Sequence, residues 1–158
     1  MNIRTILHPT DFSEYSRNAW HLACALARDY GARLVLLHVR DIPLGVYGEF
    51  GAAPPDVVDV DTLKDELARV EPTAPGVTVE RKLSEGDPVS EIIRVAQENA
   101  ADVIVMGTHG RTGLGRLLMG SVAEQVVRRA ACPVLTVKTP ISEAVLEEQP
   151  EAEAVGVG

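Results

Sequence analysis

The chain has 158 residues, of which 46% are hydrophobic and 24% are charged, and its formal net charge is −8. This length and balance suit one globular domain with its own core, so neither a disulfide framework nor a structural metal is required. The negative charge argues against nucleic-acid polymers and anionic membrane surfaces as partners. No apolar segment has the length of a signal peptide or of a membrane span, which takes about 18 residues, so we expect a cytoplasmic protein.

The first part of the chain alternates a strand, a helix and a second strand. The apolar run IRTILH predicts a strand at residues 3–8. Apolar residues at helical spacing, from Tyr15 onward, predict a helix over residues 13–30, which Gly31 ends. The sequence RLVLLHV at residues 33–39 is apolar at nearly every position, which predicts a strand buried on both faces.

The middle of the chain begins with a long loop. Residues 40–58 contain three Pro and three Gly without any period. A short helix is predicted at residues 61–70, and the alternating sequence VTVERKL at residues 77–83 predicts a strand at a sheet edge. Asp87 followed by Pro88 predicts the start of another helix, with Asp as N-cap and Pro at the first helical position.

The last part repeats the pattern of strand, helix and strand. The continuous apolar run DVIVMG predicts a buried strand at residues 102–107. Residues 121–130 predict a helix, because Ser121 and Glu124 match the S-x-x-E pattern of a capping box. The partly alternating sequence PVLTVK at residues 133–138 predicts a second edge strand.

Five strands that alternate with four helices predict an α/β fold of parallel βαβ units. We expect one domain with an open five-stranded parallel sheet in the order 3-2-1-4-5 and helices on both faces, a Rossmann-like arrangement. In this order the chain reverses direction between strands one and four, and ligands bind beyond the carboxyl ends of the strands at such a point. The segments expected there are residues 8–11 and the glycine segment, residues 107–121 (GTHGRTGLGRLLMGS).

The glycine segment matches neither of the two common phosphate-binding motifs. A Walker A loop needs Gly-Lys-Ser/Thr, which the chain lacks, and the Rossmann fingerprint fails at Leu118. What remains is the spacing Gly107, two residues, Gly110, nine residues, Gly120 and Ser121, between a strand and a helix N-terminus. Free backbone N–H groups at a helix N-terminus attract phosphate, so phosphate binding is one interpretation. A mobile loop followed by an ordinary capped helix is the other.

This spacing, together with PTDFSE after the first strand, resembles the universal stress protein family. The resemblance covers residues 1–138. It implies a nucleotide-binding domain that holds ATP, and a homodimer formed through the last strand, Val134 to Val137. Residues 139–158 hold five Glu and no Lys or Arg, so we expect a disordered acidic tail outside this domain.

The resemblance also implies an ATP site at the ends of the central strands. Asp11 would accept hydrogen bonds from the adenine or the ribose hydroxyls, Val39 would contact the adenine, and Ser121 would bind phosphate. The full set of implied contact residues is Pro9, Thr10, Asp11, Val39, Met106, Gly107, His109, Gly110, Arg111, Gly120, Ser121 and Val122.

Each of these roles has a plainer alternative. Asp11 would serve equally as the cap of the first helix. Val39 and Met106 have the character of ordinary core residues. Ser121 would serve as an N-cap alone, and Arg111 as a solvated surface charge.

No catalytic constellation has supporting local sequence. His8, His38, Asp11 and His109 share one rim of the expected sheet, but a Mg²⁺ ion held through nucleotide phosphates is favoured over a metal site made by the protein. Neither a base that positions water nor an arginine finger is identified, so we expect slow ATP hydrolysis at most. The alternatives are a dimeric interaction protein without nucleotide and, by fold analogy alone, a nucleotide-using transferase.

Overall fold

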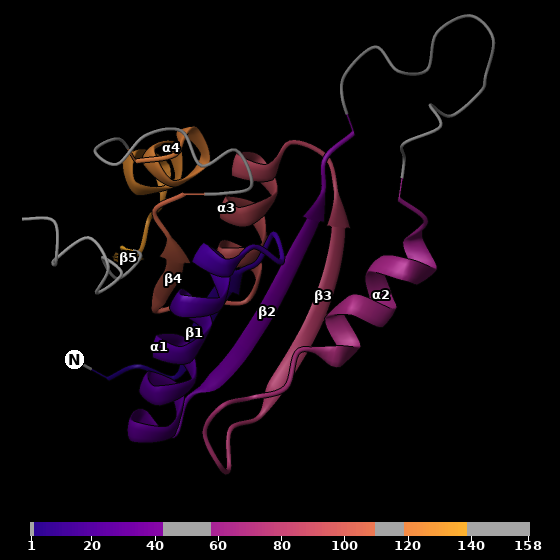
Figure 1. The fold of residues 1–158 in the computed structure, drawn as a ribbon. Coiled ribbons are helices and arrows are strands. Elements are labelled where there is room, and N and C mark those ends of the chain that lie inside the picture. Colours follow the sequence, from indigo (N-terminus) through magenta and orange to yellow (C-terminus); the bar gives the residue numbers. More distant parts are fainter. Residues whose placement is uncertain (1, 43–57, 110–118, 139–158) are drawn as a thin grey trace, which may run out of the picture.

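The computed structural model describes residues 2–42, 58–109 and 119–138 (Figure 1). Strands and helices alternate along these residues, as the sequence predicts. Their bounds are β1 (Thr5–Pro9), α1 (Glu14–Tyr30), β2 (Arg33–Arg40), α2 (Val60–Arg69), β3 (Val79–Glu85), α3 (Pro88–Glu98), β4 (Val103–Gly107), α4 (Ser121–Arg129) and β5 (Val134–Val137).

The strands form one parallel sheet in the order β3-β2-β1-β4-β5, which confirms the predicted topology. In the register of the sheet, Leu7 of β1 lies beside Val35 of β2 and Ile104 of β4. The central strands are buried along most of their length, whereas β3 and β5 are largely half-buried. The continuous apolar runs and the two alternating sequences therefore distinguish central strands from edge strands correctly.

Helices cover both faces of the sheet (Figure 1). On one face, Ile6 and Leu36 of the central strands pack with residues of α1 and with Leu67 of α2. On the other, Leu7 and Ile104 pack with apolar residues of α3 and α4. Each fully buried Leu or Ile side chain contributes about 1.5–3 kcal/mol, so these two clusters are the main source of stability. Residues Pro9, Val39 and Gly107, at or near the carboxyl ends of their strands, lie at the same edge of this frame.

Helix α1 begins one residue later than predicted, and its most buried stripe is only partly the predicted one. Of the predicted apolar series, Ala19 is buried, Leu22 and Leu26 pack half-buried against the core, and Tyr30 is 49% exposed. The buried stripe is Ser16, Ala19, Trp20, Ala23, Cys24 and Ala27. Its small side chains let the helix backbone lie close to β1 and β4, and close packing here decides the orientation more than hydrophobicity does.

Helix α4 begins differently from the prediction. A capping box needs Ser121 at the N-cap, but the N-cap is Gly120 and Ser121 is the first helical residue. No side chain caps this helix, whereas Ser13, Asp59 and Asp87 accept backbone N–H groups at the starts of the other three helices described. The capping-box prediction is therefore wrong by one position, and the Ser121 hydroxyl is not engaged as a cap.

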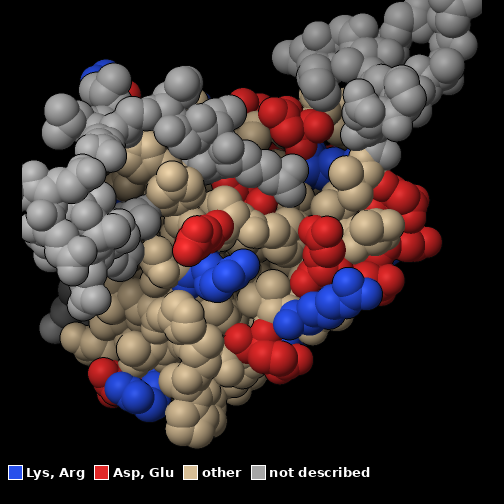
Figure 2. Space-filling view, in the orientation of Figure 1, with Lys and Arg blue, Asp and Glu red and all other residues tan. Residues whose placement is uncertain are grey.

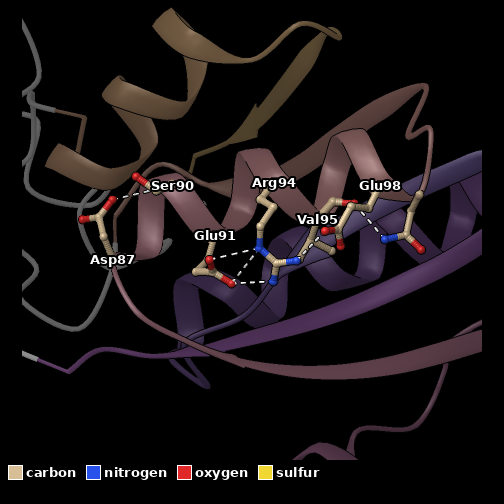
Figure 3. Close-up of polar contacts among 7 residues, drawn as sticks. Asp87, Ser90, Glu91, Arg94, Val95 and Glu98 are labelled. Atoms are coloured by element: carbon tan, nitrogen blue, oxygen red, sulfur yellow. Dashed lines mark hydrogen bonds and ion pairs between the residues drawn. The ribbon is translucent and has the colours of Figure 1, made fainter.

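The outer surface of α3 carries a chain of ion pairs (Figure 3). Arg94 lies between Glu91 and Glu98, with N–O distances of 2.6 Å to each carboxylate. Asp87 caps the helix by accepting the backbone N–H of Ser90 at 2.9 Å, which confirms the predicted start. Water and salt screen these exposed pairs, so they contribute little stability and mark this surface as a solvated one.

Two predicted segments lie wholly or largely outside the described residues: the loop at residues 40–58 and the acidic tail at residues 139–158. Strand β2 extends one residue further than predicted, because Arg40 remains in register with Glu85 of β3 and its carbonyl accepts the N–H of Gly86 at 3.0 Å. In the part of the chain that the structure describes, no helix combines the length and the apolar character needed to cross a bilayer.

Candidate functional site

The loop after β1 is fixed to β2 by two backbone contacts. The N–H of Thr10 donates to the carbonyl of Leu37 at 2.8 Å. The Thr10 carbonyl in turn lies 2.8 Å from Nδ1 of His38. A carbonyl can only accept, so this ring nitrogen carries the proton and donates it. His38 therefore holds the peptide bond that joins Thr10 to Asp11.

Phe12, in the same loop, has a strained backbone. Its φ of 63° lies in the left-handed region, which bulky residues seldom adopt. Its N–H donates to the Thr10 hydroxyl at 3.1 Å, and its ring centroid lies 4.5 Å from that of His38. Strain of this kind persists only where the surroundings enforce it, and it is common at functional sites.

Asp11 does not cap helix α1. One oxygen of its carboxylate accepts the N–H of Ser13 at 3.0 Å, and the hydroxyl of Ser13 is the cap, accepting the N–H of Ser16. The capping alternative for Asp11 is therefore wrong. The carboxylate lies one step outside the helix, in the turn that precedes it.

A buried polar chain supports the loop from below. Nδ1 of His8 donates to the carbonyl of Val105 at 2.8 Å, and its Nε2 lies 3.3 Å from the hydroxyl of Ser16. The Ser16 hydroxyl donates to that of Thr10 at 2.8 Å. Burial lowers the pKa of His8 to about 4, so the ring is neutral at pH 7. This chain joins β1, β4, α1 and the loop into one unit.

A metal site at this rim has no support in the described residues. No group of three His, Cys, Asp or Glu side chains among them is placed to hold a metal ion. Both ring nitrogens of His8 are within hydrogen-bond distance of protein groups, so this side chain serves structure rather than ligation.

Gly107, at the end of β4, is required by packing. A Cβ atom added at this position would lie 2.9 Å from the backbone oxygen of Tyr15, in the first turn of α1. The sequence analysis names Gly107 only as an implied ATP contact. The structure adds a packing reason for the glycine, the close contact between α1 and β4.

The two ends of the glycine segment meet at Thr108. The N–H of Thr108 donates to the carbonyl of Val137 in β5, at 3.1 Å, and the carbonyl of Thr108 accepts the N–H of Gly120 at 2.6 Å. The chain between residues 108 and 120 thus leaves and returns at one point. Gly110 and Arg111, two of the predicted contact residues, lie outside the described residues.

His109 lies beside this point and is held on one side. Its Nδ1 is 2.9 Å from the Thr108 hydroxyl, and its ring centroid is 5.6 Å from that of Tyr15. Its Nε2 is buried and has no hydrogen-bond partner among the described residues. A buried polar atom of this kind is most stable with a partner, which makes His109 a credible contact for a bound group.

The start of α4 presents unpaired donors. The backbone N–H groups of Ser121 and Val122 belong to the first turn, whose N–H groups have no acceptor within the helix. The N-terminal end of a helix also carries partial positive charge. No side chain of the described residues caps this helix, so its first-turn N–H groups are suited to an anion.

The described members of the predicted set gather at one edge of the sheet. Pro9 ends β1 and is followed by Thr10 and Asp11, and Val39 lies near the end of β2. The other described members end β4, follow it or begin α4: Met106, Gly107, His109, Gly120, Ser121 and Val122. Met106 is also buried in the core beside α3 and α4, and Val39 packs against that core, so the core alternative also holds for both.

The sequence does not indicate which residues support the loop with Asp11 and the ring of His109. It suggests His38 only for a metal site, and it assigns no role near the site to Phe12 or Tyr15. The available signal was the polar His38 inside an otherwise apolar strand, since a buried polar side chain needs a partner.

The profile of the universal stress protein family matches residues 2–138. This chain belongs to the universal stress protein family. It is 38% identical to universal stress protein MJ0531 of Methanocaldococcus jannaschii over 149 residues, which cover 89% of this chain and 85% of that protein. A universal stress protein from Thermus aquaticus is 34% identical over 142 residues, covering 85% of this chain and 98% of the relative.

Solved structures of universal stress proteins share the fold. The structure of protein MJ0577 superposes with a TM-score of 0.70 at 31% identity, covering 90% of this chain and all of the other. A universal stress protein in complex with cAMP gives a TM-score of 0.66 at 25% identity, covering 87% of this chain and 98% of the other. That relative binds an adenine nucleotide.

Proposed function

We propose that this universal stress protein binds ATP at the edge of the sheet between β1 and β4. One observation carries the proposal: the loop with Asp11 and the uncapped start of α4 follow adjacent strands at the point where the strand order reverses. This is where open α/β sheets bind ligands. The family relative in complex with cAMP supports an adenine nucleotide as the ligand.

The adenosine would lie over the ends of β1 and β2. In this arrangement the carboxylate of Asp11 accepts hydrogen bonds from the adenine or the ribose hydroxyls. The pre-ordered backbone of Pro9 and Thr10 places that carboxylate, so binding does not have to order the loop. Val39 and Met106 provide apolar contact with the base and sugar.

The phosphates would lie at the start of α4. The backbone N–H groups of Gly120, Ser121 and Val122 and the Ser121 hydroxyl fit an anion, with the Gly120 N–H shared with the Thr108 carbonyl. His109 adds a further nitrogen nearby, and Gly110 and Arg111 complete the proposed set. A Mg²⁺ ion would bind through the phosphates themselves, because Mg²⁺ usually takes substrate oxygens and water.

ATP is proposed as a ligand or slow substrate. The site offers donors to phosphate, while rapid hydrolysis needs a positioned water and added charge stabilisation at the transferred group. We expect a turnover well below about 1 s⁻¹, the lower end of ordinary enzyme rates. Phosphate release measured with saturating MgATP tests this, and turnover at or above that rate contradicts it.

The decisive experiment is the release of bound nucleotide. Purified protein is heat-denatured and the supernatant is separated by anion exchange, and the same preparation is titrated with ATP by calorimetry. Adenine nucleotide in the supernatant, or saturable binding that Asp11→Ala weakens without unfolding the protein, supports the proposal. If there is neither release nor binding, the alternative of a dimeric interaction protein without nucleotide replaces it.

Two further properties complete the proposal. The protein acts as a cytoplasmic homodimer, with β5 as the shared edge, and residues 1–138 form the functional domain without the acidic tail. The half-buried edge strand with its exposed Leu135 supports the first of these.

A further inference from the structure

A cavity lies between α1 and α2 and borders the loop that carries Asp11. Its volume is about 490 Å³, within the range of small-molecule sites. It lies on the face of the sheet that α1 and α2 cover, since its floor includes His8 and Leu36. Thr10 is the one residue of the proposed nucleotide set that also lines it.

The lining of the cavity is mixed, with apolar walls, several hydroxyl groups and the imidazole rings of His8 and His21. Trp20, Leu36, Phe12 and Val70 provide aromatic and aliphatic walls, and the hydroxyl of Ser16 lies at its floor. Sites of this composition bind organic molecules, because the apolar walls supply affinity and the few polar groups fix orientation.

Hydrogen bonds on both sides hold the walls in place. The indole N–H of Trp20 donates to the carbonyl of Glu71, at 2.9 Å, and so ties α1 to the chain that follows α2. On the other side, Arg81 of β3 donates to the carbonyls of Leu67 and Val70 at the end of α2, at 2.9 and 2.7 Å. These hydrogen bonds hold α1 and α2 in place on both sides of the cavity, so the cavity is part of the folded structure.

The mouth of the cavity carries two arginines without ionic partners. Both Arg17 of α1 and Arg69 of α2 line it and are exposed. In the described ranges neither side chain makes a hydrogen bond or an ion pair. Other described arginines, Arg4 and Arg129 among them, also lack an ion pair, so what marks this opening is that two such side chains lie together at one cavity. Elsewhere on the surface, acidic and basic side chains are interspersed (Figure 2).

We infer that the cavity between α1 and α2 is a second binding site, for a small organic anion with an aromatic or aliphatic body. The body packs against Trp20, Leu36 and Val70, and the anionic group pairs with Arg17 and Arg69. Arg favours such groups because its planar fork donates two parallel hydrogen bonds. Two carboxylates, Glu66 and Glu71, also line the cavity and repel an anion. Removing the charge of one of them should therefore strengthen anion binding.

The probe is 8-anilinonaphthalene-1-sulfonate, an aromatic anion whose fluorescence rises in apolar surroundings. Full-length protein at pH 7 is titrated with it, and the dissociation constant is compared among variants of matched thermal stability. Arg17→Gln combined with Arg69→Gln should weaken binding by about tenfold, as expected for the loss of charge-assisted hydrogen bonds. Glu66→Gln should strengthen it. If Glu66→Gln instead weakens binding, or the arginine variant binds like wild type, the anion site is wrong.

One cavity-filling variant and one matched control test whether the dye binds in the cavity. Val70→Trp should abolish dye binding by occupying the space, while Thr62→Trp, an equal change at an exposed position of α2 that does not line the cavity, should not. Gly120→Val should leave dye binding unchanged. Dye binding that survives Val70→Trp, or that ATP displaces competitively, overturns the inference. The outcomes for the two tryptophan variants do not depend on ATP binding, so this inference and the proposed function fail separately.

Discussion

At the scale of single residues, His38 determines where Asp11 lies. Its ring donates to the Thr10 carbonyl and stacks beside Phe12, so one side chain supports both neighbours of Asp11. The family motif PTDFSE marks the loop but not this support, which comes from a strand some 25 residues further along the chain. The hydrogen bond from His38 to Thr10 exists only once β1 and β2 lie side by side in the sheet. The local motif therefore could not reveal it.

We predict that His38→Leu weakens ATP binding about tenfold, because it leaves the Thr10 carbonyl without its donor, a loss of about 1–3 kcal/mol for a buried group. His38→Asn should retain most of the affinity, since its side-chain amide can donate from a position close to Nδ1. Calorimetric titration with ATP measures both, and thermal melting shows whether each variant is folded. Equal affinities in wild type and His38→Leu would remove His38 from this role.

His8 should make the fold sensitive to acid. Its pKa in the fold is about 4, below the ordinary value of 6.5, so the unfolded chain binds a proton that the folded chain rejects. The stabilisation is complete above pH 6.5 and is lost as the pH falls from 6.5 to 4, by about 3 kcal/mol at most.

Urea unfolding of wild type and His8→Asn at pH 7 and pH 4.5 tests this. The asparagine keeps a donor for the Val105 carbonyl and does not titrate. The variant should therefore lose less stability than wild type between the two pH values. If both proteins lose the same free energy of unfolding between the two pH values, the acid sensitivity comes from the carboxylates and not from His8.

At the scale of elements, patterns in the sequence identified the helices and strands of the described residues but missed two local details. The S-x-x-E pattern places the cap of α4 at Ser121, whereas Gly120 holds that position and donates its N–H to the Thr108 carbonyl. The most buried stripe of α1 shares Ala19 with the predicted apolar series but continues through Ala23 and Ala27, because the helix packs closely against the sheet. Both details depend on contacts with distant segments, which periodicity does not contain.

Substitutions of Gly107 and Gly120 should have different effects on stability and on ATP affinity. Gly107→Ala places a Cβ 2.9 Å from the Tyr15 carbonyl oxygen, so it should lower the melting temperature and ATP affinity together. Gly120→Val should lower ATP affinity at least tenfold with little change in melting temperature, because the backbone at Gly120 (φ −58°, ψ 151°) accepts any residue. A Gly107→Ala protein as stable as wild type, or a Gly120→Val protein with wild-type affinity, would contradict the assignment.

At the scale of the whole molecule, β5 is an edge strand, with no neighbour on its outer side among the described residues. Leu135 on this strand is 39% exposed, and Val127 of α4 is 44% exposed. We predict a homodimer in which β5 and these side chains are covered. Leu135→Asp should convert it to a monomer by light scattering at micromolar concentration, with the fold intact by circular dichroism. A monomeric wild type under the same conditions would rule out this interface.

The order of the strands and the position of the proposed ATP site could be predicted from the sequence, because both follow from the alternation of apolar strands and helices. The cavity between α1 and α2 could not. Its walls meet through Trp20 and Glu71, which are 51 positions apart, and through Arg81 on a third element. Such a space is defined only when three elements are packed together, and no local pattern encodes it.

The backbone of Thr108 links three elements of the fold. Its N–H donates to Val137 of β5 and its carbonyl accepts the N–H of Gly120, so the end of β4, the strand beside it and the start of α4 are joined through one peptide unit. Backbone groups carry these bonds, so substitutions of the Thr108 side chain leave them in place. The start of α4 therefore stays aligned with the end of β4 whatever side chain occupies position 108.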